Sequence, residues 1–165
     1  MISHDCKIRV WYCDTDQMGI VHHSNYIRYY EEARSDLLRM MGLSYAEVER
    51  RGLMMPILEV QSKYRRPARY DEEVTVRILL KEIPSTRINF RYEVRNERGD
   101  LLNSGMTQLG FMHAETRRPC RCPEWFLDLL RTHWVEEYPL VKNTTPRDSK
   151  VAGRTFIGVV QATSR

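Results

Sequence analysis

The sequence predicts an α+β protein in which one long helix lies across a curved antiparallel sheet. Two observations carry this prediction. Residues 25–41 place apolar side chains at helical spacing and contain no helix breaker. Three later segments between residues 74 and 112 alternate apolar and polar residues, as strands do, and turn residues separate them.

The long helix is the best-defined element of the pattern. Ser24 and Asn25 are competent N-caps, and Gly42 is a natural stop. The residues expected on its apolar face recur at spacings of three and four: Ile27, Tyr30, Arg34, Leu37, Leu38 and Met41. We therefore expect this side of the helix to be buried by the sheet.

The other elements are shorter. Ser44 and Glu47 form a capping box, which predicts a short helix over residues 44–51. Strands are predicted over residues 7–13, 53–61, 74–80, 88–94 and 101–112, and a closing helix over residues 123–134. Pro56 favours an edge position or the start of a strand. The small residues Ser104, Gly105 and Gly110 are expected to let the long helix approach the sheet closely.

Length and composition bound the class of protein. The 165 residues suit one domain, which we place at residues 1–135, and the net charge is only +4. No apolar run approaches the roughly 18 residues of a membrane span, and the N-terminus lacks a signal-peptide pattern, so we expect a cytoplasmic protein. A small basic excess without aromatic platform motifs disfavours nucleic-acid binding.

The cysteines and histidines do not predict a metal site. Cys120 and Cys122 form a C-x-C pair, which is not the usual spacing of structural zinc ligands. His22 and His23 are adjacent, so their side chains diverge, and the pattern supplies no third ligand. We expect free thiols, no metal and no cofactor.

Polar chemistry is concentrated between the first strand and the long helix. This loop contains Asp14, Asp16, Gly19, His22 and His23. The start of a helix offers backbone N–H groups that can stabilise a developing negative charge. A carboxylate beside such donors indicates acyl transfer or hydrolysis.

The same loop carries a resemblance to a known family. The segment Tyr12–Tyr26, YCDTDQMGIVHHSNY, resembles the signature of acyl-CoA thioesterases of the 4-hydroxybenzoyl-CoA thioesterase type. That signature is D-x-D-x-x-G-x-V, then an aromatic residue or His, then N-Y or S-Y. The segment Tyr64–Asp71, YRRPARYD, more weakly resembles the basic and aromatic stretch before the family's long meander. The resemblance covers about residues 5–131.

The resemblance implies the hot-dog fold, in which a curved sheet wraps one helix. It also implies a homo-oligomer, a dimer or a tetramer of two dimers, with the pantetheine arm at a subunit interface. The implied reaction is hydrolysis of an acyl-CoA thioester, and an acyl carrier protein is a second possible partner. The alternative is a non-catalytic hot-dog module that binds an acyl group, an acyl-CoA or an acyl carrier protein.

Asp16, the second Asp of D-x-D, is the implied catalytic carboxylate, as a nucleophile or as a general base. Asp14 is expected to satisfy loop N–H groups. His23 is a second catalytic candidate, because it could hydrogen-bond Asp16 or the thioester. Gly19 is expected to adopt a turn conformation closed to other residues, and a backbone N–H near Val21 is a candidate oxyanion donor.

Further binding candidates lie at both ends of the predicted site. Tyr26 could contact the acyl group or pack the helix entry. Arg65 and Arg66 could hold the phosphates of coenzyme A, although a solvated strand edge would also carry such residues. Residues 136–165 form an extension that is either partly disordered or packed on a neighbouring subunit.

Overall fold

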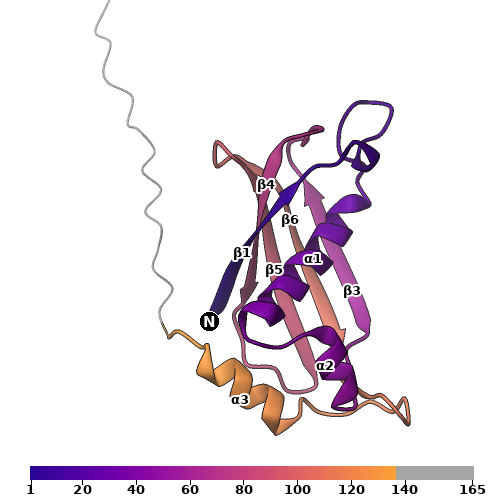
Figure 1. The fold of residues 1–165 in the computed structure, drawn as a ribbon, viewed down its shortest axis with the longest axis vertical. Coiled ribbons are helices and arrows are strands. Elements are labelled where there is room, and N and C mark those ends of the chain that lie inside the picture. The colour runs from indigo at the N-terminus through magenta and orange to yellow at the C-terminus, as the bar shows by residue number, and fades with distance from the viewer. Residues whose placement is uncertain (137–165) are drawn as a thin grey trace, which may run out of the picture.

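The structure, a computed structural model, describes residues 1–136. Within them a five-stranded antiparallel sheet has the order β1-β4-β5-β6-β3, and helix α1 lies across one face (Figure 1). The strands are β1 (Ile2–Arg9), β3 (Ile57–Tyr64), β4 (Glu73–Leu80), β5 (Arg87–Asn96) and β6 (Leu101–Gly110), and β2 (Leu53–Met54) pairs with β7 (Met112–His113). The helices are η1 (Tyr12–Asp14), α1 (Asn25–Met40), α2 (Tyr45–Arg50) and α3 (Glu124–Thr132). The predicted α+β architecture is confirmed.

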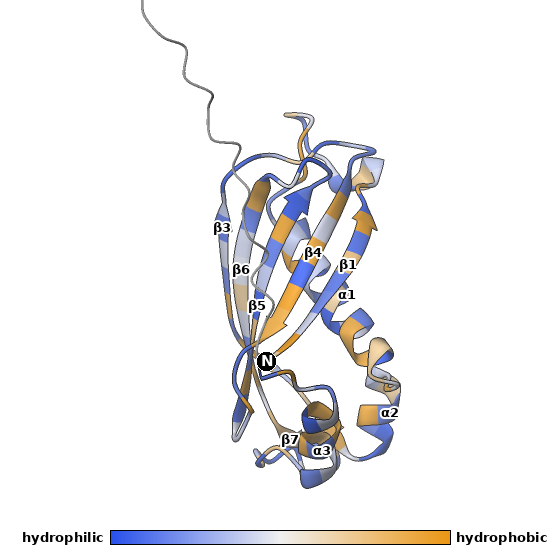
Figure 2. Ribbon diagram, turned by 90° about the vertical axis from the view of Figure 1, so that its left-hand side faces the viewer, coloured by the Kyte–Doolittle hydropathy of each residue, from blue (hydrophilic) through white to orange (hydrophobic). Residues whose placement is uncertain are grey.

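The core lies between α1 and the inner face of the sheet. Inward residues of β4 and β5 are the alternate apolar positions of the sequence: Val74, Val76, Ile78, Leu80, Ile88, Phe90, Tyr92 and Val94. Figure 2 shows hydrophobic and hydrophilic residues alternating along these strands. Because alternate side chains point to opposite faces, this pattern fixes which side of the sheet meets the helix.

Helix α1 buries most of the predicted face and ends where Gly42 adopts a φ of +80°. Tyr30, Arg34 and Leu37 are buried as expected, but Ile27 is 42% exposed. Ile27 was therefore placed on the wrong face. The buried face of α1 is rotated relative to the predicted one. It also includes Tyr26, Tyr29 and Ala33, which are all buried.

The first strand differs from its prediction. It was expected over residues 7–13, but β1 runs over Ile2–Arg9, and residues 12–14 form the short helix η1. Polar residues near the N-terminus interrupt the apolar pattern by which a strand is predicted, although they belong to the strand. Their side chains bind residues of other elements. His4 contacts Asp36 at 2.7 Å, and Arg77 forms a bidentate pair with Asp5 at 2.7 and 2.6 Å.

Strand β3 is an edge strand, as Pro56 predicted, and it pairs within the described chain only with β6. Gly105 of β6 confirms the expected close approach, because a Cβ there would overlap the phenol ring of Tyr30 on α1. Gly110 instead lies beside Leu58 of β3. A glycine in a strand commonly marks such a point of close packing.

The two short helices close the end of the sheet that is far from the α1 N-terminus (Figure 1). Ser44 accepts a hydrogen bond from the Glu47 amide at 3.2 Å, which caps α2 as predicted. In α3 the side chains of Phe126 and Leu130 are buried in the core. The predicted extension lies outside the described residues from residue 137 onwards.

The outer face of the sheet is polar and carries more basic than acidic side chains. One hollow on this face is lined by a single acidic residue, Glu93, and by three basic residues, Lys63, Lys81 and Arg91. Within residues 1–136 none of these three forms a recorded ion pair, whereas nearby Arg95 pairs with Glu93 at 2.9 Å. Uncompensated positive charge therefore gathers on the side of the sheet opposite α1.

Candidate active site

The loop between β1 and α1 is anchored by one buried carboxylate. Asp14 is 1% exposed, accepts hydrogen bonds from the Trp11 amide at 3.1 Å and the Tyr29 hydroxyl at 2.9 Å, and forms an ion pair with Arg28. Burial, and then the hydrogen bond to Asp14, raise the pKa of Tyr29, so its hydroxyl remains a donor. Asp14 thus ties the loop to the first turns of α1.

Asp16 lies two residues further on, in a very different environment. Its backbone closes a small turn, with the Asp16 amide donating to Ile20 O and the Gly19 amide to Asp16 O, each at 2.9 Å. Gly19 has a φ of +71°, as expected for this turn. One carboxylate oxygen, Oδ1, accepts the Met18 amide at 2.8 Å. Within residues 1–136 the other oxygen has no recorded hydrogen-bond partner.

A cavity of about 290 Å³ lies beside Asp16. Its wall contains Asp16, Met18, Ile20, Val21, His23, Tyr26, Tyr64, Arg65, Arg66 and Pro67. The fold therefore brings the β1–α1 loop against the end of β3, although these segments lie about 45 residues apart in sequence. Six of the seven predicted site residues line this cavity, and Gly19 shapes its loop without lining it.

Tyr64 lines the cavity but was not predicted as a site residue. In the sequence it appears only as the first residue of the stretch with the weaker family resemblance. Its hydroxyl donates to the His23 carbonyl at 3.0 Å, and its ring meets the Tyr26 ring edge-on with centroids 5.5 Å apart. Tyr64 therefore joins β3 to the start of α1. Burial raises the pKa of Tyr26, which is partly offset by its hydrogen bond to the Ala68 backbone.

The histidines do not form the predicted contact with Asp16. In the described part of the chain, no hydrogen bond joins His23 to Asp16. His22 Nδ1 instead lies 2.8 Å from Ser24 Oγ, and the two histidine rings lie with their centroids 4.1 Å apart. The His23 ring belongs to the cavity wall and is exposed to solvent.

Two of the three backbone amides between this loop and α1 already donate hydrogen bonds, which leaves one candidate oxyanion donor. The Val21 amide donates to Ala68 O at 2.9 Å, and the His22 amide donates to Asp14 O at 2.8 Å. Within residues 1–136 the His23 amide donates to no acceptor, and it lies one residue before Ser24, the N-cap of α1. An unpaired amide beside a cavity is suited to hold a developing negative charge.

The two arginines of the wall differ in their partners. Arg66 pairs with Asp100 at 3.1 Å, whereas Arg65 has no recorded ion pair within the described residues. The amides of both arginines donate to Leu102 O, which fixes their backbone at the end of β3. Arg65 is therefore the more available cation at the cavity rim.

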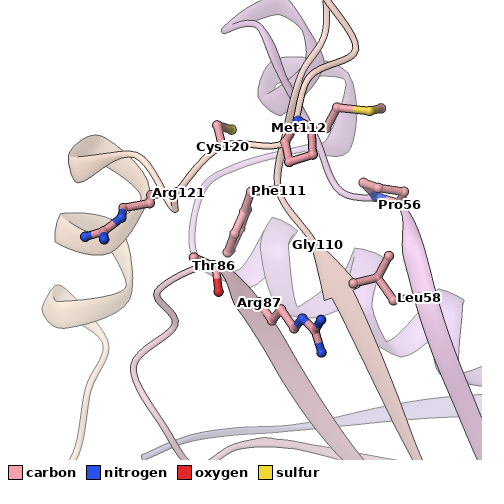
Figure 3. A pocket seen from close by; sticks show the side chains of 10 residues that line it. Pro56, Leu58, Thr86, Arg87, Gly110, Phe111, Met112, Cys120 and Arg121 are labelled. Carbon is pink, nitrogen blue, oxygen red and sulfur yellow. The ribbon is translucent and has the colours of Figure 1, made fainter.

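A larger cavity, of about 540 Å³, lies at the opposite end of β3 (Figure 3). Its wall includes Leu58, Phe111, Met112 and Cys120, and Figure 3 shows the Arg121 side chain directed away from Phe111. This wall contains no carboxylate or imidazole. It therefore lacks a group suited to activate a nucleophile.

Neither a metal centre nor a membrane span is found in the part of the chain that the structure describes. No group of three His, Cys, Asp or Glu side chains there is placed to bind a metal ion. No described helix is long and apolar enough to cross a membrane. The cytoplasmic location expected from the sequence stays a prediction.

Residues 10–130 match the family model of the thioesterase-like superfamily. A Bacillus subtilis protein named as a candidate acyl-CoA thioesterase, YneP, is 32% identical over 122 residues, which are 74% of this chain and 88% of that protein. The solved structure of a DHNA-CoA thioesterase from Staphylococcus aureus is 32% identical, with a TM-score of 0.73 over 79% of this chain and 88% of the other. A Thermus thermophilus structure of 40% identity has a TM-score of 0.75 and covers 82% of this chain and 100% of its own.

Proposed function

This chain belongs to the thioesterase-like superfamily, has the hot-dog fold and is a thioester hydrolase, and we propose that it hydrolyses acyl-coenzyme A at Asp16. The substrate class rests on the names of the relatives, which are those of an acyl-CoA thioesterase and a DHNA-CoA thioesterase. The observation that carries the proposal is local. Asp16 lines a cavity near the α1 N-terminus, and within residues 1–136 one of its oxygens accepts the Met18 amide while the other accepts no hydrogen bond.

Two routes use this carboxylate. As a general base, Asp16 takes a proton from water while the water oxygen bonds to the thioester carbonyl carbon. As a nucleophile, its free oxygen bonds to that carbon and gives a mixed anhydride, which water then hydrolyses. In both routes the C–S bond breaks, the acid is released, and the coenzyme A thiolate takes up a proton.

The carbonyl oxygen becomes negative when the nucleophile adds, and we assign its stabilisation to the His23 amide. This amide lies one residue before the N-cap of α1, close to the end of the helix whose dipole favours negative charge. Removing a single oxyanion donor from a hydrolase costs about 10²–10³ in rate, so one well-placed amide is a large effect. The His23 ring is placed to contact the thioester from the wall.

The acyl group and the coenzyme A phosphates are matched to wall residues by the chemistry of their side chains. Tyr26, Tyr64 and Met18 give an apolar wall suited to the acyl group. Arg65, at the rim, is suited to the phosphates of coenzyme A because a guanidinium can donate two parallel hydrogen bonds to phosphate oxygens. Arg66 can join it only by loosening its pair with Asp100.

We also propose a homo-oligomer built from dimers that pair through β3. The outer edge of β3 has no strand beside it in the described chain, and Ile57 and Leu58 are 44% and 53% exposed. An exposed apolar edge strand is a ready site for pairing with a second chain. Antiparallel pairing of two β3 strands would continue the sheet across the dimer.

The test is thiol release from short-chain, long-chain and aromatic acyl-CoAs by the wild type and by Asp16→Asn. We expect a loss of roughly 10²-fold or more in kcat, on the usual scale for an acid–base group. Asp128→Asn, the same change on the exposed face of α3, is the matched control and should retain full activity. Single turnover in ¹⁸O-labelled water tests for the anhydride: ¹⁸O in Asp16 establishes the nucleophilic route with water attacking the aspartyl carbon, because general-base attack labels only the product acid.

Equal rates for wild type and Asp16→Asn would remove Asp16 from the mechanism. No release from any acyl-CoA, followed by release from an acyl carrier protein thioester, would move the substrate to the carrier. No release from either would favour the non-catalytic binding module.

A further inference from the structure

A closed ring of hydrogen bonds lies under α1, between the helix and the edge of the sheet. The Tyr30 hydroxyl donates to Asn103 Oδ1, and Asn103 Nδ2 donates to Ser62 Oγ at 2.8 Å. Tyr30 has a single hydroxyl hydrogen, so Ser62 Oγ donates the third bond, at 3.0 Å, to the Tyr30 oxygen. Each member of this triad gives one hydrogen bond and receives one.

The triad is buried and closely fitted. Tyr30 and Asn103 are both 0% exposed. Gly105, opposite Ser62 in the β3–β6 ladder, has no side chain, and this leaves room for the Tyr30 ring. A buried polar group that loses its partner costs the full desolvation penalty, so the triad specifies one position of its three members.

The triad connects α1 to the strand that carries the cavity wall. Ser62 precedes Tyr64 by two residues on β3, so both side chains point towards α1. Tyr26, one helical turn before Tyr30, contacts the Tyr64 ring. Helix α1 therefore meets β3 at two levels, through the triad and through the aromatic contact at the cavity.

We infer that Tyr30, Ser62 and Asn103 are positioning residues that hold the end of β3 in place and so set the position of Tyr64 in the cavity wall. The inference rests on the proposed function for its kinetic consequence. None of the three lines the cavity. They act through Tyr64 and the neighbouring Arg65, because within the described chain β3 pairs only with β6, and the triad joins it to α1.

The kinetic test is Tyr30→Phe, which keeps the ring and removes the hydroxyl. We expect KM for acyl-CoA to rise about fivefold, within the range of coupling seen inside one hydrogen-bond network. We expect kcat to change less than about twofold, because the reacting groups stay on the β1–α1 loop. A merely structural loss would lower the active fraction and so reduce apparent kcat at constant KM.

Tyr92→Phe is the matched control. Tyr92 is equally buried and stacks on Tyr30 with ring centroids 4.3 Å apart, but its hydroxyl contacts Thr107 and Arg34 rather than β3. Its loss should leave KM within about twofold of wild type. The Tyr30→Phe effect should also disappear in a Tyr64→Ala background, since the wall that it positions is then gone.

A second measurement needs no substrate, so it still decides the inference if the proposed function fails. Amide hydrogen exchange should become faster over residues 57–64 in Tyr30→Phe and stay unchanged over residues 73–80, whereas Tyr92→Phe should spare residues 57–64. Unchanged exchange in β3 would overturn the inference. In an active enzyme, an equal rise of KM with and without Tyr64 would overturn it as well.

Discussion

At the scale of single residues, the site depends on two carboxylates that differ in environment although one residue separates them. Asp14 is buried and fully bonded, so its role is to hold the loop. Asp16 lines the cavity, and within residues 1–136 only one of its carboxylate oxygens accepts a hydrogen bond, so it is available for chemistry. The difference comes from the fold around each side chain, because the residue type is the same.

Asp14→Asn should destabilise the protein by about 2 kcal/mol, because buried Asp14 loses its ion pair with the half-exposed Arg28 and a carboxylate acceptor becomes a weaker amide. Chemical denaturation of the purified variant measures this change in the free energy of unfolding. Asp128→Asn, whose carboxylate is exposed, should stay within about 0.5 kcal/mol of wild type. Equal stability of the two variants would contradict the anchoring role of Asp14.

Most of the candidate site could be predicted from the sequence because its residues are close together in the chain. Asp16, Val21, His23 and Tyr26 occupy one loop and one helix start, and a motif of this length is visible directly. The contact of Tyr64 with Tyr26 could not be predicted in this way. It depends on how β3 lies beside α1, which no local pattern in the sequence specifies.

At the scale of elements, Gly105 is the position where α1 and the sheet are closest. Gly105→Ala should destabilise the protein by about 1–3 kcal/mol, because the new methyl group forces the Tyr30 ring to move and disturbs a well-packed core. Thermal unfolding checks this expectation.

Gly99→Ala is a useful comparison for that variant, since Gly99 lies in an exposed turn with a φ of +83° and has open space around it. Its cost is only that of the backbone conformation, about 1 kcal/mol. A smaller loss for Gly105→Ala than for Gly99→Ala would show that the helix can withdraw from the sheet without difficulty.

The elements could be predicted where burial follows a simple period. Strands β4 and β5 are buried on one side only, so their alternation is clear in the sequence. Ile27 was misplaced because the buried side of α1 is defined largely by tyrosines, which are apolar in their rings and polar at their hydroxyls. The start of β1 was missed because His4 and Asp5 pair with other elements and so conceal the strand.

At the scale of the whole molecule, the proposed pairing through the open edge of β3 predicts the mass of the assembly. We expect the wild type to elute as a multiple of its 19.7 kDa mass in size-exclusion chromatography with light scattering. The double variant Ile57→Lys with Leu58→Lys should shift towards 19.7 kDa, because like charges would then face each other across the edge.

Ile83→Lys introduces the same charge at a comparably exposed apolar residue, 42% exposed, which does not belong to β3. It should leave the oligomer intact. A monomeric wild type, or dissociation by Ile83→Lys alone, would rule out pairing through this edge.

Three cations lie around the hollow on the outer face: Lys63, Lys81 and Arg91. Their electrostatic field extends beyond the atoms that they contact. Coenzyme A carries several phosphate charges, so with the proposed acyl-CoA substrate we expect a field of this sign to increase the rate of encounter. The field reaches about 8 Å at physiological ionic strength and less in stronger salt. A sheet that continues across two subunits would place two such hollows on one face. The two hollows would then attract an anionic substrate together, so the attraction would be a property of the dimer and not of one subunit.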